Sequence, residues 1–142
     1  MKGLSNLIRL HKLKLTEQQK KLTDLQAVAH GFQSETEAID KSAREEAAND
    51  EKSAETAFLL GGYVQASLAR RATLQASLTE IEREMAIVRD LVAAAFRELK
   101  RYELIAQRHE ADQARVRRKR ERHMENEVGM LMHRQKVRST GI

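Results

Sequence analysis

The chain has 142 residues and a formal net charge of +5; 33% of its residues are charged, 4% are aromatic, and it has no Pro, Trp or Cys. So few aromatic side chains argue against a compact globular core, and the lack of Cys excludes a disulfide framework and cysteine zinc sites. The sequence contains no run of about 18 apolar residues that would predict a membrane span, and its N-terminal residues lack a signal-peptide pattern. We therefore expect a cytoplasmic protein.

The first predicted helix covers about residues 4–50 and carries a heptad seam. Apolar or tolerated side chains recur from Leu4 at steps of four and three, which is typical of a coiled coil. The seam positions are Ile8, His11, Leu15, Gln18, Leu22, Leu25, Ala29, Phe32, Thr36, Ile39 and Ala43. Leu7, Leu10, Leu13 and Val28 make this stripe wider than a strict two-stranded seam requires.

A turn is predicted within residues 50–62, where the seam lapses. The stretch "NDEKSAETAFLLGGYV" contains Gly61-Gly62, the only paired helix breaker in the sequence. In a chain without proline, glycine is the residue that most readily leaves helical geometry.

The second predicted helix covers about residues 63–137 and has its own heptad seam. Its positions are Leu74, Leu78, Ile81, Met85, Val88, Val92, Ala95, Leu99, Tyr102 and Ala106. Two amphipathic helices joined by a short break bury their stripes most simply against each other. We therefore expect an all-α fold, an antiparallel two-helix coiled-coil hairpin with a longer second helix, forming a single domain over residues 1–142, with Leu25 opposite Val88.

A basic run lies where the longer helix extends past the first. Counting back from the turn places Leu4 opposite about residue 108. The run therefore has no intramolecular partner, and it holds six basic residues against one acid, Glu121. They are Arg115, Arg117, Arg118, Lys119, Arg120 and Arg122. Such a concentration of charge predicts an anionic partner.

No pattern of catalytic chemistry is present. Gly61-Gly62 is followed by Tyr-Val, not by the Lys-Ser/Thr of a phosphate loop, and a hairpin offers no dry pocket. His123 with Glu127, and His109 with Gln113, have helical spacing that could place two metal ligands on one face, but no third ligand converges. We expect a non-enzyme with no catalytic residues, no cofactor and no metal site.

Two stretches carry a resemblance to known proteins: the opening, "LSNLIRLHKLKLTEQQKKLTDLQ", and the second arm, "GGYVQASLARRATLQASLTEIEREMAIVRDLVAAAFRELKRYE". Together they resemble the FliJ family, small coiled-coil proteins of the bacterial flagellar export apparatus. The resemblance implies a hairpin similar to the central stalk of rotary ATPases, which inserts into the hexameric flagellar export ATPase and contacts the cytoplasmic domain of the FlhA export gate. It also implies escort of export chaperones, and association with the inner membrane only through these partners.

The resemblance also implies binding residues. Family members contact the gate through apolar and aromatic positions at the start of the second arm, and the matching positions here are Phe58, Leu60, Tyr63 and Leu68. The basic residues from Arg115 to Arg122 become the candidates for binding the ATPase ring.

Two alternatives stay open. One is the equivalent stalk protein of a virulence type III secretion system. The other is a basic coiled-coil nucleic-acid-binding protein. Two observations argue against it: the basic run follows the seam instead of preceding it, and no aromatic residue for base stacking lies among its arginines. Direct membrane binding has little support, because Val116 is the only apolar residue between residues 115 and 122.

Overall fold

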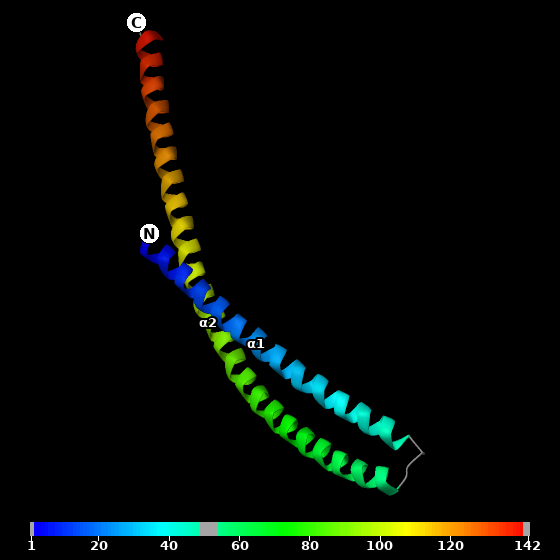
Figure 1. The fold of residues 1–142 in the computed structure, drawn as a ribbon. Coiled ribbons are helices and arrows are strands. Elements are labelled where there is room, and N and C mark those ends of the chain that lie inside the picture. The colour runs from blue at the N-terminus through cyan, green and yellow to red at the C-terminus, as the bar shows by residue number, and fades with distance from the viewer. Residues whose placement is uncertain (1, 49–53, 141–142) are drawn as a thin grey trace. The chain divides into compact units, whose positions relative to one another are not determined.

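The structure, a computed structural model, describes residues 2–48 and 54–140, which form two α-helices. Helix α1 covers Lys2–Ala47 and helix α2 covers Ala54–Thr140 (Figure 1). The described residues contain no strand, and the two helices pack against each other. The predicted all-α fold with a longer second helix is confirmed.

Contacts between residues divide the chain into two compact units. One unit consists of residues 11–97; the other combines the start of α1, up to Leu10, with α2 from Glu98 onward. Helix α2 is continuous through both units. No helix in the described part of the chain is sufficiently long and apolar to span a membrane.

Within the unit of residues 11–97, α1 and α2 run antiparallel, because Leu25 lies opposite Val88 whereas Glu35, further along α1, pairs with Arg70, which lies earlier in α2. Two ion pairs join the helices near the start of α2. Arg70 Nη2 lies 2.8 Å from Glu35 Oε1, and Arg71 Nε lies 3.0 Å from Asp40 Oδ1. These four side chains are between 41% and 54% exposed, so water screens each pair, which adds only about 0–1 kcal/mol to stability. Their main effect is to favour one register of the two helices over its neighbours.

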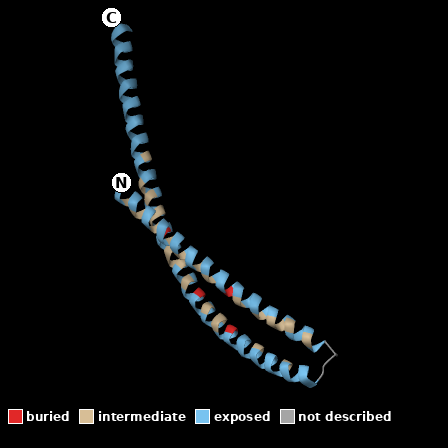
Figure 2. Cartoon of the chain, viewed as in Figure 1, coloured by how far each residue is buried: buried red, intermediate tan, exposed pale blue. Residues whose placement is uncertain are grey.

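The apolar seam lies where the heptads predict it. The buried residues are Ala29, Leu74, Met85 and Leu99, and the other predicted positions of α2 are half-buried. In α1 the predicted seam is half-buried up to Ile39 (Figure 2). Ala43 is the exception: it is exposed, while Ser42 and Glu46 are half-buried. A single methyl group is too small to hold the register where its neighbours are polar.

The other unit buries side chains from both of its segments. Leu4, Leu7 and Ile8 of α1 are half-buried, as are Tyr102 and Ala106 of α2. The last half-buried residue of α2 is Ala114. The packing of α2 therefore ends at about Ala114, although apolar side chains such as Met130, Leu131 and Met132 follow it and are exposed.

The expected role of Gly61-Gly62 as a helix breaker is wrong. Helix α2 already begins at Ala54, so both glycines are helical, and no glycine among the described residues has a positive φ. Residues 50–53 of the expected turn region lie outside the described residues. A helical glycine costs about 1 kcal/mol relative to alanine, which a long cooperative helix tolerates.

Replacing Gly61 or Gly62 by Ala is expected to stabilise α2. A Cβ atom at either position meets no atom within 4 Å, and both residues already have negative φ. Each substitution should therefore gain roughly 0.5–1 kcal/mol and raise the midpoint of thermal unfolding followed by circular dichroism. A lowered midpoint would show that the helix does not continue through this pair.

Candidate docking surfaces

The end of α2 from Arg115 to Thr140 is exposed on all sides. Each of its residues is exposed, including the six predicted ring-binding residues (Figure 2). Within the described structure no other segment packs on this part of the helix. Its basic side chains are therefore accessible to a partner.

Four of the six basic residues share one side of the helix. Spacings of three, one and three residues bring them within about one third of the circumference, and they border one shallow hollow with Ala111 and Asp112. These residues, which we call the cationic face, are Arg115, Arg118, Lys119 and Arg122. Arg115 of this face forms an ion pair with Asp112, one turn earlier.

The other two basic residues lie on a different side. Arg117 and Arg120 border a separate hollow with His109, Gln113 and Val116. We call Arg117 and Arg120 the back pair. The sequence run looks like a uniform block of charge, but the helix distributes it over two sides, which meet where Arg120 borders a third hollow with Lys119 and Arg122.

Of the two histidines near the basic run, His123 is exposed and His109 is half-buried. His123 Nε2 lies 3.2 Å from Glu127 Oε1, one turn along the helix. No group of three or more metal-ligating side chains comes together in the described part of the chain. The His123 and Glu127 side chains are both largely exposed, and a solvated pair of this kind does not make a metal site.

The predicted gate-binding residues lie at the start of α2 and differ in exposure. Phe58 is 84% exposed, Leu68 58% and Tyr63 51%, whereas Leu60 is half-buried. Leu60 therefore belongs partly to the helix pair. The other three side chains point in different directions, since their spacings of five and five residues do not return to one side of a helix.

Two neighbouring apolar residues that the sequence reasoning missed extend this surface. Leu59 is 70% exposed and Val64 is 41% exposed. Leu59 and Tyr63 are four residues apart and share one side of α2, and Val64 and Leu68 share another. The signal was present in the sequence for Leu59, which does not fit the seam that begins at Leu74, whereas Val64 lies on the backward extension of that seam, two heptads before Leu78.

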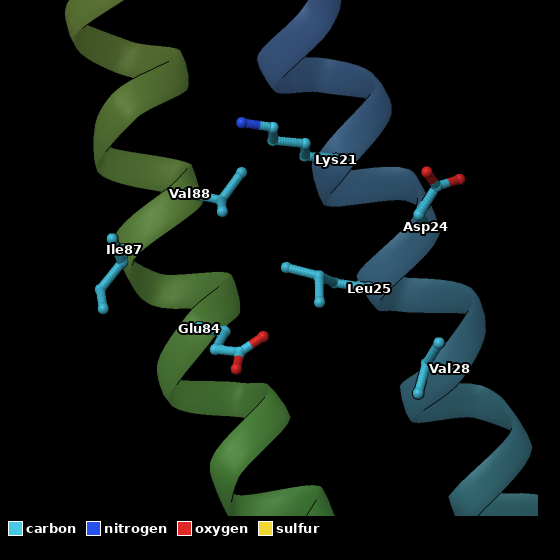
Figure 3. A pocket seen from close by; sticks show the side chains of 7 residues that line it. All are labelled: Lys21, Asp24, Leu25, Val28, Glu84, Ile87 and Val88. Atoms are coloured by element: carbon cyan, nitrogen blue, oxygen red, sulfur yellow. The ribbon is translucent and has the colours of Figure 1, made fainter.

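A groove between the two helices was not predicted from the sequence. It has a volume of about 410 Å³ and is lined by Lys21, Asp24, Leu25, Val28, Glu84, Ile87 and Val88. Leu25 and Val88 point toward each other across it, as the heptad alignment predicts, while Ile87 lies on its outer side (Figure 3). Val28 and Ile87 remain exposed here, and Val28 is one of the residues that widen the seam of α1.

Comparison with known proteins gives one kind of relative. The chain is 29% identical over 115 residues to the flagellar FliJ protein of Caulobacter vibrioides strain NA1000 / CB15N, an alignment that covers 81% of this chain and 79% of the relative. The flagellar FliJ protein of strain ATCC 19089 / CIP 103742 / CB 15 of the same species matches equally. No protein-family model matches the chain. No solved structure matches it either.

Proposed function

We propose that this homologue of the flagellar FliJ protein, a component of the flagellar export apparatus, acts there as a non-enzymatic stalk that binds the export ATPase and the export gate. The observation that carries the proposal is the similarity to FliJ over 81% of the chain. The antiparallel pair of helices, with its longer second helix, supports it. Because the relative is a flagellar protein, we favour a flagellar role over one in a virulence secretion system.

The exposed end of α2 is the part that we assign to the hexameric export ATPase. It carries the cationic face and the back pair on a helix that has no other packing role among the described residues. Exposed charges attract an oppositely charged partner over a distance and contribute many weak contacts, which suits docking that must form quickly. The matching surface on the ATPase would be acidic.

The start of α2 is the part that we assign to the cytoplasmic domain of the FlhA export gate. Phe58, Tyr63 and Leu68 expose apolar and aromatic surface that the helix pair does not cover. Exposed apolar clusters mark interaction sites, and aromatic residues often dominate the binding energy. We assign Leu60 a smaller part, because it is half-buried.

The remaining parts of the proposal follow from the family. The chain is not an enzyme, as FliJ proteins are not, and it needs no cofactor. It works in the cytoplasm, reaches the inner membrane only through the export apparatus, and escorts export chaperones. The groove between Leu25 and Val88 is a surface on which an additional helix could lie.

The gate assignment is tested by replacing Tyr63 and Leu68 together with Ala. We expect the affinity for the isolated cytoplasmic domain of the gate to fall by at least about tenfold. Each truncated side chain removes apolar area that the gate would bury, and each should therefore reduce the binding free energy by about 1 kcal/mol or more. Isothermal titration calorimetry would measure the affinity.

Circular dichroism of the same variant provides the control. Both side chains are more than half exposed, so the helix content and the unfolding midpoint should stay close to those of the unmodified chain. Loss of helicity in parallel with loss of binding would assign Tyr63 and Leu68 to the core of the helix pair instead. Unchanged gate binding would remove the gate role from this surface.

A further inference from the structure

The first turns of α2 expose an unusual amount of apolar surface. Between Ala54 and Thr73 only Leu60 and Ser67 are half-buried, and every other residue is exposed. Five large apolar side chains lie in this segment, and we call them the apolar cluster: Phe58, Leu59, Tyr63, Val64 and Leu68. Leu59 and Tyr63 share one side of α2, and Val64 and Leu68 share the adjoining side, so these four form a continuous surface of the kind that partners cover, while Phe58 lies outside it on another side of the helix.

Helix α1 does not cover the apolar cluster, because its own sequence is polar at this end. The stretch from Glu35 to Ala47 contains one large apolar residue, Ile39, which is half-buried. Two ion pairs, Glu35 with Arg70 and Asp40 with Arg71, join the helices here. The apolar cluster is therefore not part of an intramolecular core.

The same end of the helix pair is acidic, although the whole chain is basic. Once the two interhelical ion pairs are set aside, residues 35–47 and 54–71 retain four acids and two bases, a local net charge of −2 in a chain of +5. The acids are Glu37, Glu45, Glu46 and Glu55, and the bases are Lys41 and Arg44. Glu55 precedes Leu59 and Tyr63 at spacings of four residues, so acid and apolar side chains lie on one side of α2.

We propose that this end of the α1–α2 pair binds a cationic amphipathic protein segment, whose aliphatic or aromatic side chains cover the apolar cluster and whose Lys or Arg side chains face Glu37, Glu45 and Glu55. The inference rests on the proposed function, since it specifies the chemical character of the part of the gate that binds to this surface. Apolar burial supplies the affinity, and opposite charge at the rim selects the partner and speeds its docking.

The chain thus carries two docking surfaces of opposite electrostatic character. The exposed end of α2 is strongly basic, and the end at the start of α2 is acidic and apolar. A partner that suits one surface is repelled by the other, which is a form of discrimination between partners. The two surfaces therefore do not compete for the same protein.

The test measures binding of two probe peptides to the full chain by fluorescence anisotropy. Both are amphipathic helical peptides about three heptads long with Leu at the seam positions; one carries Lys and the other Glu at the flanking positions. We expect the Lys peptide to bind at least about tenfold more tightly than the Glu peptide at low salt, although the chain is basic overall. Equal binding, or preference for the Glu peptide, would overturn the inference.

Charge variants locate the binding. Replacing Glu37, Glu45 and Glu55 together by Gln should weaken binding of the Lys peptide by about tenfold, because three rim charges are lost. The matched control, Glu17, Glu82 and Glu110 to Gln, removes the same charge from exposed positions elsewhere and should change the affinity by less than about twofold. Equal losses in the two variants would mean unspecific attraction and would overturn the inference.

Gate binding separates this inference from the proposed function. If Tyr63→Ala with Leu68→Ala weakens gate binding but the Glu37, Glu45 and Glu55 variant does not, the gate role stands and the cationic character of its partner element is wrong. If the acid variant weakens both peptide and gate binding, the inference is supported. If the Lys peptide binds as expected while the gate does not bind at all, the surface chemistry is right and the proposed gate role is wrong.

Discussion

Replacing the whole cationic face, Arg115, Arg118, Lys119 and Arg122, by Gln is expected to weaken binding to the export ATPase by about thirtyfold. An exposed ion pair contributes at most about 1 kcal/mol, and four pairs at roughly 0.5 kcal/mol each give about 2 kcal/mol. Single substitutions should therefore have small effects. Surface plasmon resonance of the ATPase on immobilised chain measures the affinity, and stimulation of ATP hydrolysis measures the consequence.

The two faces of the basic helix provide a matched control. Arg118→Gln with Arg122→Gln removes two charges from the cationic face, and Arg117→Gln with Arg120→Gln removes two charges from the back pair. If the cationic face meets the ATPase, the first double variant should bind more weakly than the second. Equal losses would show that the ring surrounds the helix without choosing a side.

The nucleic-acid alternative predicts a different result for the same variants. A nucleic-acid binder would lose affinity for a DNA duplex when its cationic face is removed, with a steep dependence of log affinity on log salt, and would not affect any ATPase. We expect weak DNA binding and a clear ATPase effect. An unchanged ATPase response combined with loss of tight DNA binding would replace the role that we give this segment.

Leu74→Ala is expected to destabilise the helix pair by about 2–3 kcal/mol. Leu74 is 1% exposed and is the most buried large side chain among the described residues. Truncating a buried leucine removes its transfer free energy and leaves a cavity that a thin seam fills only partly by relaxation. Chemical denaturation followed by circular dichroism would give the change in unfolding free energy.

Leu68→Ala is the control for that measurement. It is the same substitution in the same helix, but Leu68 is 58% exposed, so the change should stay within about 0.5 kcal/mol. A similar loss of stability in both variants would mean that Leu68 packs against another part of the chain in solution. It would also count against the use of Leu68 as a docking residue.

Most of the fold could be predicted from the sequence, because the contact residues of a coiled coil recur at alternating spacings of three and four residues. The repeat correctly placed Leu74, Met85 and Leu99 in the seam and paired Leu25 with Val88. The start of α2 was predicted incorrectly, because a glycine pair is a weak signal beside a long cooperative helix. Ala43 was misplaced for a related reason, since a small side chain contributes little to the choice of register.

The candidate surfaces could be predicted only in part. The charge of the segment from Arg115 to Arg122 is obvious in the sequence, and its lack of packing followed from the fading seam. The separation into a cationic face and a back pair needed the helix to be established over that segment. The apolar cluster was predicted only in part, because the exposure of Leu59 and Val64 depends on the polar sequence of α1 that lies opposite them.

The thin seam also sets how the stability of this protein responds to temperature. The heat capacity of unfolding comes mainly from apolar surface that becomes hydrated, and globular proteins gain about 12–15 cal/mol/K per residue. Here only four of the described residues are buried, and the longest exposed stretch of α2 contributes almost nothing. The heat capacity change per residue is therefore small, and the stability curve is broad and shallow. Such a protein loses its order gradually on warming and is little affected by cold.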